Sequence, residues 1–412
     1  MKVRTKFLLS GAIILAVALS SQFNSELLLS ITNSFTGSDT SSNSETTQET
    51  TVEDSESIPN VLRLGYFPNL NHAQVIIGLA NGHFQKALSE NSSTSGENGD
   101  QGTTIKEYVF SAGPSAIEAL YAGQIDVAYV GPNPAINGYM ASNGEGIRII
   151  SGSASGGAVF VVRNDSGISS TTDLGGKKFA SPQLGNTQDV ALRKYLKQNG
   201  YETVENGGNV TVVPVKPSDI LTLMLKKEID GAWVPEPWGA RLVKESNAKI
   251  FVDERDLWPP DGKFATTNII VRTDYLKDNP EVIRKLINAQ IDETLWINST
   301  LNELQKSNVT SPSGNVENQN IDRDGVELFI HAFNDGLERV TGNTVPEDEL
   351  RDALQRLEFT YDPIKRSLFK MADDAYDLGL IGRGTKPDLT NIYDLGLLNQ
   401  VLKERNHPLD NS

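Results

Sequence analysis

The chain has 412 residues, of which 38 % are hydrophobic and 22 % charged, so it is long enough for more than one lobe and apolar enough to bury a core. Its 37 Lys and Arg face 53 Asp and Glu, and the net charge of −16 argues against nucleic-acid binding, because phosphate contacts need clustered basic side chains. The sequence contains no cysteine, which excludes disulfides, thiolate catalysis, Cys-ligated zinc, iron–sulfur clusters and lipid attachment through an N-terminal cysteine.

The N-terminal residues have the pattern of an export segment. Lys2, Arg4 and Lys6 precede an apolar run over residues 7–19, as in a secretory signal. The run is shorter than the roughly 20 residues of a membrane span, but further apolar residues up to Ile31 extend it. Residues 1–31 are therefore expected to be either a cleaved signal peptide or a retained membrane anchor, and both alternatives stay open.

A Ser/Thr-rich, acidic stretch follows over residues 32–57 and has almost nothing to bury. This composition predicts a disordered tether. An export segment, a tether and a folded body suit a protein that is exported and acts at the outer face of the cytoplasmic membrane, either anchored there or secreted.

From Val61 onward, short β-type runs alternate with helical apolar spacing. The expected strands are residues 61–66, 105–110, 126–130, 147–150, 159–163, 179–181, 210–214, 231–234, 249–252 and 267–272. The expected helices are residues 73–80, 115–121, 135–141, 190–198, 220–226, 240–245 and 280–304, and most of the stretch 324–402 is expected to be amphipathic helix. A polar insertion over residues 89–104 is expected to be a surface loop.

This alternation predicts an α/β protein with mainly parallel sheets. The Ser/Gly-rich stretch 151–157 separates two runs of the alternation, and the second run ends near Asp253. We therefore expect lobe 1 to comprise residues 58–152 and 254–412, including the C-terminal helices, and lobe 2 to comprise residues 153–253. Two crossings between the lobes would form a two-stranded hinge, which suits closure of a cleft around a ligand.

The sequence carries no catalytic signature. It lacks a P-loop, a dinucleotide-binding glycine motif, a zinc-protease motif, a nucleophile elbow and a calcium-binding loop. Its four histidines, His72, His83, His331 and His407, have no metal-ligand spacing. We therefore expect no enzyme, no metal site and no cofactor.

Segments rich in Gly, Pro, Ser and Asn lie between expected strands and helices, at residues 111–115, 131–134, 184–189 and 234–238. In open α/β sheets, ligands bind beyond the carboxyl ends of the strands, where helix N-termini favour anions. Ordinary helix capping explains any one of these segments. Their recurrence in one chain favours a ligand-binding cleft.

Three of these stretches also resemble a known family. They read GYFPNLNHAQVIIGLANGHF, FSAGPSAIEALYAGQIDVAYVGPNPAI and GAWVPEPWGARLV. They resemble the substrate-binding proteins of ABC importers, in the nitrate/sulfonate/taurine family, which is related to proteins that bind thiamine-pyrimidine precursors. The resemblance covers roughly residues 61–299, and the helical C-terminal portion contributes little to it.

The resemblance implies the type II periplasmic-binding-protein fold, with two α/β lobes, a two-stranded hinge and a helical C-terminal portion. It implies an extracytoplasmic, non-enzymatic, monomeric binding protein. Such a protein would capture a small anionic or zwitterionic solute of the sulfonate, taurine or nitrate type by hinge closure. Its partners would be the solute, an ABC permease and its ATPase, and the membrane through the N-terminal segment.

The resemblance also implies a set of ligand-binding residues. In lobe 1 these are Asn69, Asn71, His72, Gly113, Pro114, Ser115, Gly131 and Asn133, and on the inter-lobe strand Ser153 and Ser155. In lobe 2 they are Asn186, Thr187, Gln188, Trp233, Glu236 and Trp238.

Several of these residues have a structural alternative. Trp233, Trp238 and also Phe67 could cover a ring or alkyl chain of a ligand, but core packing explains them as well. Glu236 could face a positive or donor group, as in taurine or an aminopyrimidine, but a carboxylate also complements the start of a helix.

Two other functions stay open. One is a thiamine-pyrimidine-precursor binding protein or a synthase-like enzyme of the same fold, against which the missing cysteine-rich motif and the export segment both count. The other is the ligand-binding component of a sensor.

Overall fold

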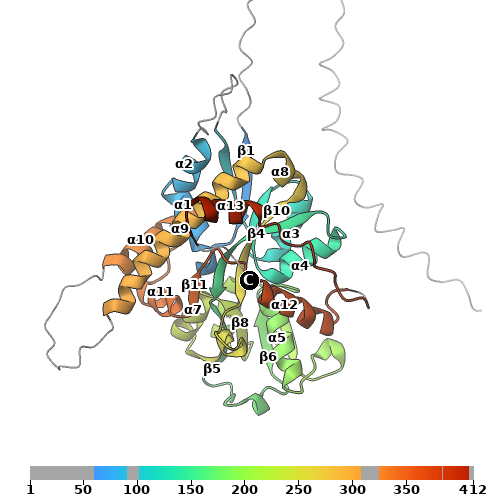
Figure 1. The fold of residues 1–412 in the computed structure, drawn as a ribbon. Coiled ribbons are helices and arrows are strands. Elements are labelled where there is room, and N and C mark those ends of the chain that lie inside the picture. The colour runs from blue at the N-terminus through green and yellow to red at the C-terminus, as the bar shows by residue number, and fades with distance from the viewer. Residues whose placement is uncertain (1–59, 91–101, 308–323, 383, 408–412) are drawn as a thin grey trace, which may run out of the picture. The chain divides into compact units, whose positions relative to one another are not determined.

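Two β-sheets organise the part of the chain that the structure describes (Figure 1). This computed structural model describes residues 60–90, 102–307, 324–382 and 384–407. All of them belong to one structural unit, residues 57–412. The expected export segment 1–31 and tether 32–57 lie outside the described residues, as does most of the expected loop 89–104. Within the described ranges, every helix is too short or too polar to cross a bilayer.

Sheet A has the strand order β11-β4-β10-β3-β1-β2. Its strands are β1 (Val61–Tyr66), β2 (Thr104–Val109), β3 (Val127–Val130), β4 (Ile147–Gly156), β10 (Ala265–Arg272) and β11 (Leu357–Phe359). β1 pairs in parallel with β2 and β3, whereas β10 is antiparallel to β3 and β4, and β11 is antiparallel to β4.

Sheet B has the order β7-β6-β8-β5-β9. Its strands are β5 (Ala158–Arg163), β6 (Lys178–Ser181), β7 (Thr211–Pro214), β8 (Gly231–Pro235) and β9 (Ala248–Asp253). β6 is parallel to β7 and β8, and β5 is antiparallel to β8 and β9. The expectation of mainly parallel sheets is therefore wrong, because the strands on either side of each crossing pair antiparallel within their sheets.

The chain leaves sheet A through two glycines. Gly156 ends β4 with φ +73° and Gly157 follows with φ +70°, a backbone conformation that residues with a Cβ rarely adopt. β5 then begins sheet B at Ala158. The chain returns from sheet B to sheet A after β9, through the short helix η5 (Glu254–Leu257), and enters β10. We call this segment the return crossing. Ser153 and Ser155 thus lie in sheet A, although residue 153 was expected to open lobe 2.

Helices cover both faces of each sheet. In sheet A, alternate side chains of β3 enter different cores: Val127 and Tyr129 face α1 (Ala73–Ala80) and α9 (Pro280–Ser307), and Ala128 and Val130 face α3 (Gly113–Tyr121) and α4 (Pro132–Ala141). In sheet B, one core includes α5 (Thr187–Gln198), and the other includes α6 (Pro217–Leu225) and α7 (Trp238–Glu245).

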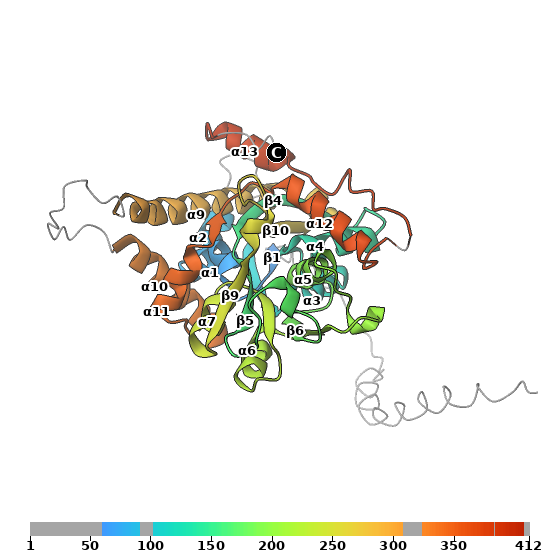
Figure 2. The same ribbon diagram turned by 90° about the horizontal axis from the view of Figure 1, so that it is seen from below.

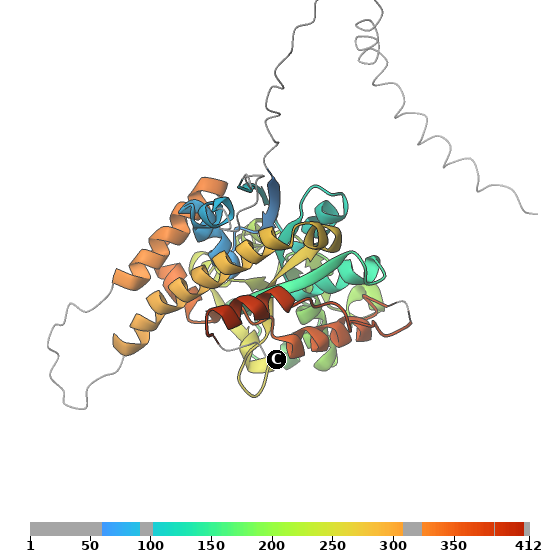
Figure 3. The ribbon, with the colours of Figure 1, turned by 45° about the horizontal axis from the view of Figure 1, so that its top comes forward.

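The C-terminal helices contact both lobes. α10 (Asp324–Thr341) packs on α1 and α9, as Figure 3 shows, and α13 (Gly396–Glu404) packs on α9. α11 (Glu347–Leu354) contacts α7 of lobe 2. α12 (Lys365–Asp377) contacts α4 of lobe 1 and α5 of lobe 2 (Figure 2). The chain after α9 therefore connects the two lobes through side-chain packing, in addition to the two crossings of the backbone.

Each strand and helix expected between residues 61 and 304 is present, with ends that shift by a few residues in most cases. The exception is β4, which was expected to end at residue 150 and runs to Gly156. Its Ser, Gly and Ala residues have low strand propensity, but pairing on both sides with β10 and β11 holds them extended. The sequence did not predict β11, α8 (Thr273–Asp278) or α2 (His83–Ser89).

Candidate ligand-binding site

A pocket lies where the carboxyl ends of the strands of both sheets meet, and we call it the ligand pocket. Its wall in lobe 1 comes from the loops after β1, β2 and β3 and from β10, and its wall in lobe 2 comes from the segments after β6 and β7 and the end of β8. The cavity between the walls has a volume of only about 20 Å³, room for the centre of about one water molecule, so the lobes are close together in this structure.

Three helices begin at the ligand pocket. Ala112, Gly131 and Asn186, the residues that precede α3, α4 and α5, all line it. None of these helices has a side-chain hydrogen bond at its N-cap, so the first N–H groups are not capped by side chains. Prolines in the first turn of α3 and α4 fix the helical φ there without losing an intrahelical hydrogen bond. Proline has no N–H, so the start of α4, with Pro132 and Pro134, offers only the N–H of Asn133, whereas the starts of α3 and α5 each offer more than one. All three helix starts direct a positive dipole end to the pocket.

Gly131 permits the close approach of the two lobes. A Cβ at this position would lie 2.3 Å from Oγ1 of Thr187, which is the first residue of α5 in the other lobe. Glycine is therefore required for the start of α4 and the start of α5 to face each other across the ligand pocket.

His72 presents a neutral imidazole to the pocket. Its Nδ1 accepts a hydrogen bond from the backbone N–H of Phe67 at 3.4 Å, which leaves the proton on Nε2. The Phe67 ring packs on the imidazole with 4.6 Å between the ring centroids. Burial lowers the pKa of His72 to about 3. At neutral pH, His72 is therefore a hydrogen-bond donor without a charge.

Several buried polar atoms of the lining lack a partner within the protein. They are Oδ1 of Asn71, Oγ1 of Thr187 and Oγ1 of Thr267, all on residues that are at least 97 % buried. The Asn71 amide is fixed by its other end, because its Nδ2 donates to the carbonyl of Gly156 at 3.2 Å. An unpaired buried polar atom costs about 1–3 kcal/mol, so these atoms favour a polar ligand in the pocket.

The described residues that line the ligand pocket include no Lys, Arg, Asp or Glu. A charge on the ligand must therefore be stabilised by neutral hydrogen-bond donors and helix ends. No cluster of three or more His, Asp or Glu side chains in the described ranges is placed to hold a metal ion.

The loop after β1 is fixed across the cleft. Nε1 of Trp238, at the start of α7, donates to Oδ1 of Asn69 at 3.1 Å. The backbone N–H of Leu70 donates to the carbonyl of Glu236 at 3.1 Å. Trp238 does not line the ligand pocket but positions Asn69, which does.

The lining contains part of the predicted set: Asn69, Asn71, His72, Gly131, Asn186, Thr187 and Gln188. Gly113, Pro114 and Ser115 form the first turn of α3, directly after the lining residues Ser111 and Ala112. Asn133 lines a neighbouring cavity.

Two serines of β4 that were expected to bind the ligand form hydrogen bonds within lobe 1 instead. The hydroxyl of Ser153 donates to Oε1 of Gln74 at 3.1 Å. The hydroxyl of Ser155 accepts from the backbone N–H of Phe264 at 3.3 Å. Both serines are buried and neither lines the ligand pocket, so here they hold β4 against its neighbours.

Trp233 belongs to the core of lobe 2 and does not line the pocket. Its ring stacks on Phe160 with 5.3 Å between centroids, and its Nε1 donates to Oε2 of Glu254 at 2.7 Å. Because side chains alternate along a strand, Trp233 faces α5 while its neighbour Val234 faces the opposite core. Pro235, at the end of the strand, is the β8 residue that lines the pocket.

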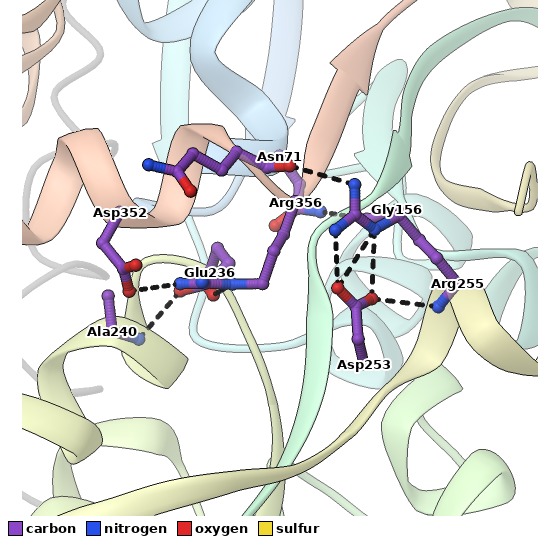
Figure 4. Close-up of polar contacts among 9 residues, drawn as sticks. Asn71, Gly156, Glu236, Ala240, Asp253, Arg255, Asp352 and Arg356 are labelled. Carbon is purple, nitrogen blue, oxygen red and sulfur yellow. Dashed lines mark hydrogen bonds and ion pairs between the residues drawn. The ribbon is translucent and has the colours of Figure 1, made fainter.

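Glu236 is fully buried and forms an ion pair outside the pocket (Figure 4). Its Oε1 lies 2.6 Å from Nε of Arg356, and its Oε2 accepts the backbone N–H of Ala240 at 3.0 Å. Nη2 of Arg356 also donates to Asp352 at 2.7 Å. Burial raises the pKa of the Glu236 carboxyl, and the Arg356 guanidinium opposes that shift. The pair joins the end of β8 in lobe 2 to the chain between α11 and β11.

This ion pair lies beside the crossing from sheet A to sheet B. The backbone N–H of Gly157 donates to the carbonyl of Arg356 at 2.7 Å, and the N–H of Glu236 donates to the carbonyl of Gly157 at 2.9 Å. Arg255, on the return crossing, is paired with Asp253 at 2.6 Å (Figure 4). The C-terminal chain therefore contacts the crossing segment directly.

The sequence did not predict these lining residues: Ser111, Ala112, Pro182, Pro217, Pro235, Thr266 and Thr267. Ser111 and Ala112 lie in the segment 111–115, and Pro235 lies in the segment 234–238, both of which were expected to border a ligand-binding cleft. Thr266 and Thr267 carry no such signal, because they line the pocket only through the place of β10 in the middle of sheet A.

Comparison with known proteins identifies the family. Residues 56–309 match the model of the NMT1-like family, which is more than half of the chain. The chain belongs to the NMT1-like family. This NMT1-like protein is 27 % identical over 214 residues to a binding protein of Brucella abortus (strain 2308), a match that covers 52 % of this chain and 63 % of the relative. It is 25 % identical over 196 residues to the taurine-binding periplasmic protein of Escherichia coli (strain K12), with 47 % of this chain and 57 % of the relative covered.

The NMT1-like protein thus spans less than two thirds of the length of these curated relatives. It is also similar in structure to the alkanesulfonate-binding protein SsuA from Xanthomonas axonopodis pv. citri bound to MOPS, with a TM-score of 0.58 and 16 % identity. That match covers 80 % of this chain and 96 % of the solved one. The expected periplasmic-binding-protein fold is therefore confirmed.

The neutral state of His72 predicts a pH dependence of stability. Because the folded pKa of about 3 lies below the ordinary value of about 6.5, the unfolded chain binds the proton first, and stability falls as the pH falls through 6.5. Between pH 7.5 and pH 5.0 the wild-type protein should lose about 2 kcal/mol more unfolding free energy than His72→Gln. Urea unfolding at both pH values measures this difference. The exposed His331→Gln is the control, and equal losses in wild type and His72→Gln would contradict a buried neutral imidazole.

The buried Glu236–Arg356 pair predicts a large effect on stability. Arg356→Ala leaves the Glu236 carboxylate buried without its partner and should lower the free energy of unfolding by about 3–5 kcal/mol. The double variant Glu236→Gln, Arg356→Met should recover much of that loss, because no buried charge remains. Lys263→Ala breaks the half-exposed pair with Glu358 and should cost at most about 1 kcal/mol. Similar losses for Arg356→Ala and Lys263→Ala, measured by urea unfolding, would show that the buried pair is not structurally important.

Proposed function

We propose that this chain is the extracytoplasmic substrate-binding protein of an ABC importer and captures a small anionic or zwitterionic solute in the ligand pocket. The observation that carries the proposal is the pocket itself: uncapped helix starts, a neutral His72 and unpartnered buried polar atoms surround a space without charged side chains. Such a site stabilises a negative charge through oriented N–H groups. The NMT1-like family and the binding proteins similar to this chain support it.

A sulfonate or taurine-type head group suits this pocket best. A sulfonate carries three oxygens that accept hydrogen bonds in different directions, and the starts of α3, α4 and α5 approach the pocket from different elements. The names of the taurine-binding and alkanesulfonate-binding proteins favour the same solutes. Nitrate is the alternative, because it would be recognised by the same kind of donors.

We further propose that binding closes a hinge between the lobes. The segments that would bend are the crossing at Gly157 and the return at residues 254–264, so lobe 2 would comprise residues 158–253. The narrow space in the pocket supports this, because a solute larger than a few waters enters only if the lobes separate.

The remaining parts of the proposal concern the surroundings of the protein. We propose that residues 1–31 export the chain or anchor it at the outer face of the cytoplasmic membrane. We also propose that the loaded monomer delivers its solute to a permease driven by an ATPase. The pocket has no nucleophile paired with a base among its lining residues, which favours binding over catalysis.

A thermal-shift screen tests the proposed function. Taurine, methanesulfonate, nitrate, bicarbonate and a neutral sulfone are added to the purified protein. A bound solute at about 100 times its dissociation constant should add roughly 2.7 kcal/mol to the stability. We expect a sulfonate to raise the melting temperature and the neutral sulfone to leave it unchanged. The absence of a shift with every anion would contradict the proposal.

Thr187→Val provides the matched variant for this screen. Because Oγ1 of Thr187 is buried without a partner in the protein, the substitution should keep or raise the melting temperature without ligand. It should weaken sulfonate binding about tenfold, the effect of losing one hydrogen bond to a charged group. Thr222→Val on the exposed face of α6 is the control. Unchanged affinity in Thr187→Val would place the solute elsewhere.

A further inference from the structure

A second cavity adjoins the ligand pocket, and we call it the side cavity. It lies between α5 of lobe 2, the segment that begins at η5, and α12 of the C-terminal portion. Thr187 lines both spaces, and Asn133, two residues after the pocket residue Gly131, lines the side cavity. The side cavity is the roomier of the two, since water centres can occupy about 140 Å³ of it.

The walls of the side cavity combine apolar and aromatic side chains with polar and charged ones. Val190 and Tyr195 come from α5, Leu257 and Trp258 come from the return crossing, and Met371 comes from α12. The Trp258 ring stacks on Phe264 with 5.3 Å between centroids, and Nζ of Lys370 lies 5.1 Å from the centre of the same ring. Val190, Leu257 and Met371 provide the apolar surface that suits a ring-sized group.

Three of the four ionisable groups of the side cavity form ion pairs with one another. Asp374 lies 3.0 Å from Nζ of Lys194 and 2.6 Å from Nζ of Lys370. The fourth, Glu254, accepts the N–H of Trp233 at 2.7 Å, and burial raises the pKa of its carboxyl to about 7. The side cavity therefore does not demand a charged ligand group.

The junction of the two spaces carries unsatisfied polar atoms. Oδ1 of Asn133 and Oγ1 of Thr187 are buried and have no partner in the protein. The Asn133 amide is fixed by its Nδ2, which donates to the carbonyl of Met371 at 3.4 Å. A ligand that passes from the ligand pocket into the side cavity would meet both atoms.

One wall of the side cavity belongs to the part of the chain outside the family match. The NMT1-like model covers residues 56–309, whereas Lys370, Met371 and Asp374 lie on α12 (Lys365–Asp377). α12 contacts α4 of lobe 1 and α5 of lobe 2, so this C-terminal helix closes the side cavity from both lobes.

We propose that the side cavity binds a ring-sized apolar substituent of the solute whose anionic head lies in the ligand pocket. The inference rests on the proposed function and narrows it: the solute is an organic anion with an aromatic or cyclic group, and not nitrate or taurine. Its size supports this, because an apolar cavity of about 150 Å³ in another protein holds a benzene molecule.

Isothermal titration calorimetry with two sulfonates tests the inference. Methanesulfonate has only the head group, and 2-phenylethanesulfonate adds a ring on a short spacer. We expect the intact protein to bind the ring-bearing sulfonate at least about tenfold more tightly, because its ring leaves water. Equal affinities would overturn the side-cavity inference alone. Failure of both sulfonates to bind would overturn the proposed function and this inference with it.

Variants locate the ring. Ala191→Phe and Gln198→Trp both fill the side cavity from α5. Either variant should remove the preference for the ring-bearing sulfonate and leave the affinity for methanesulfonate unchanged. Leu225→Trp, at an exposed leucine that ends α6, is the control and should keep the preference. Two variants are made in case one of them fails to fold. If a folded variant still binds the ring-bearing sulfonate more tightly than methanesulfonate, the inference is overturned.

Discussion

The constraint on which this structure depends is a buried pocket whose described lining residues include no charged side chain, because the anion that we propose to bind there can be stabilised only by neutral groups. The residues described around the ligand pocket offer N–H groups, hydroxyls, amides and a neutral imidazole, but no cation. Such groups stabilise an anion only if they are fixed in direction before the ligand arrives. The fold provides this, because α3, α4 and α5 each follow a strand and the residues that precede them line the same pocket.

The two lobes and the C-terminal helices satisfy this constraint together. Sheet A supplies α3 and α4, and sheet B supplies α5, so the donor set is complete only when the lobes meet, as at Gly131 and Thr187. The C-terminal chain contacts lobe 2 beside both crossings, through the buried pair of Arg356 with Glu236 and through α12 on α5. We infer that these contacts favour the closed arrangement and add a wall that the NMT1-like match does not include.

Local sequence predicted most of the elements between residues 61 and 304 and some of the segments that border the ligand pocket. Asn186 and Thr187 lie between a strand and a helix, where the fold class places ligands, whereas His72 was expected only from the family resemblance. Trp233 could not be assigned, because alternation along a strand does not reveal which face meets the pocket. Thr266 and Thr267 depend on the antiparallel pairing of β10 in sheet A, and Glu236 depends on Arg356, which is 120 residues away. Such long-range contacts leave no local pattern.

A crystal structure of the protein with a bound sulfonate would show directly whether neutral groups hold the anion. We expect the sulfonate oxygens to accept hydrogen bonds from N–H groups at the starts of α3 and α5 and from Nε2 of His72, with no Lys or Arg side chain in contact with them. A sulfonate held by a Lys or Arg side chain, or bound away from the junction of the two lobes, would show that these neutral donors do not form the anion site.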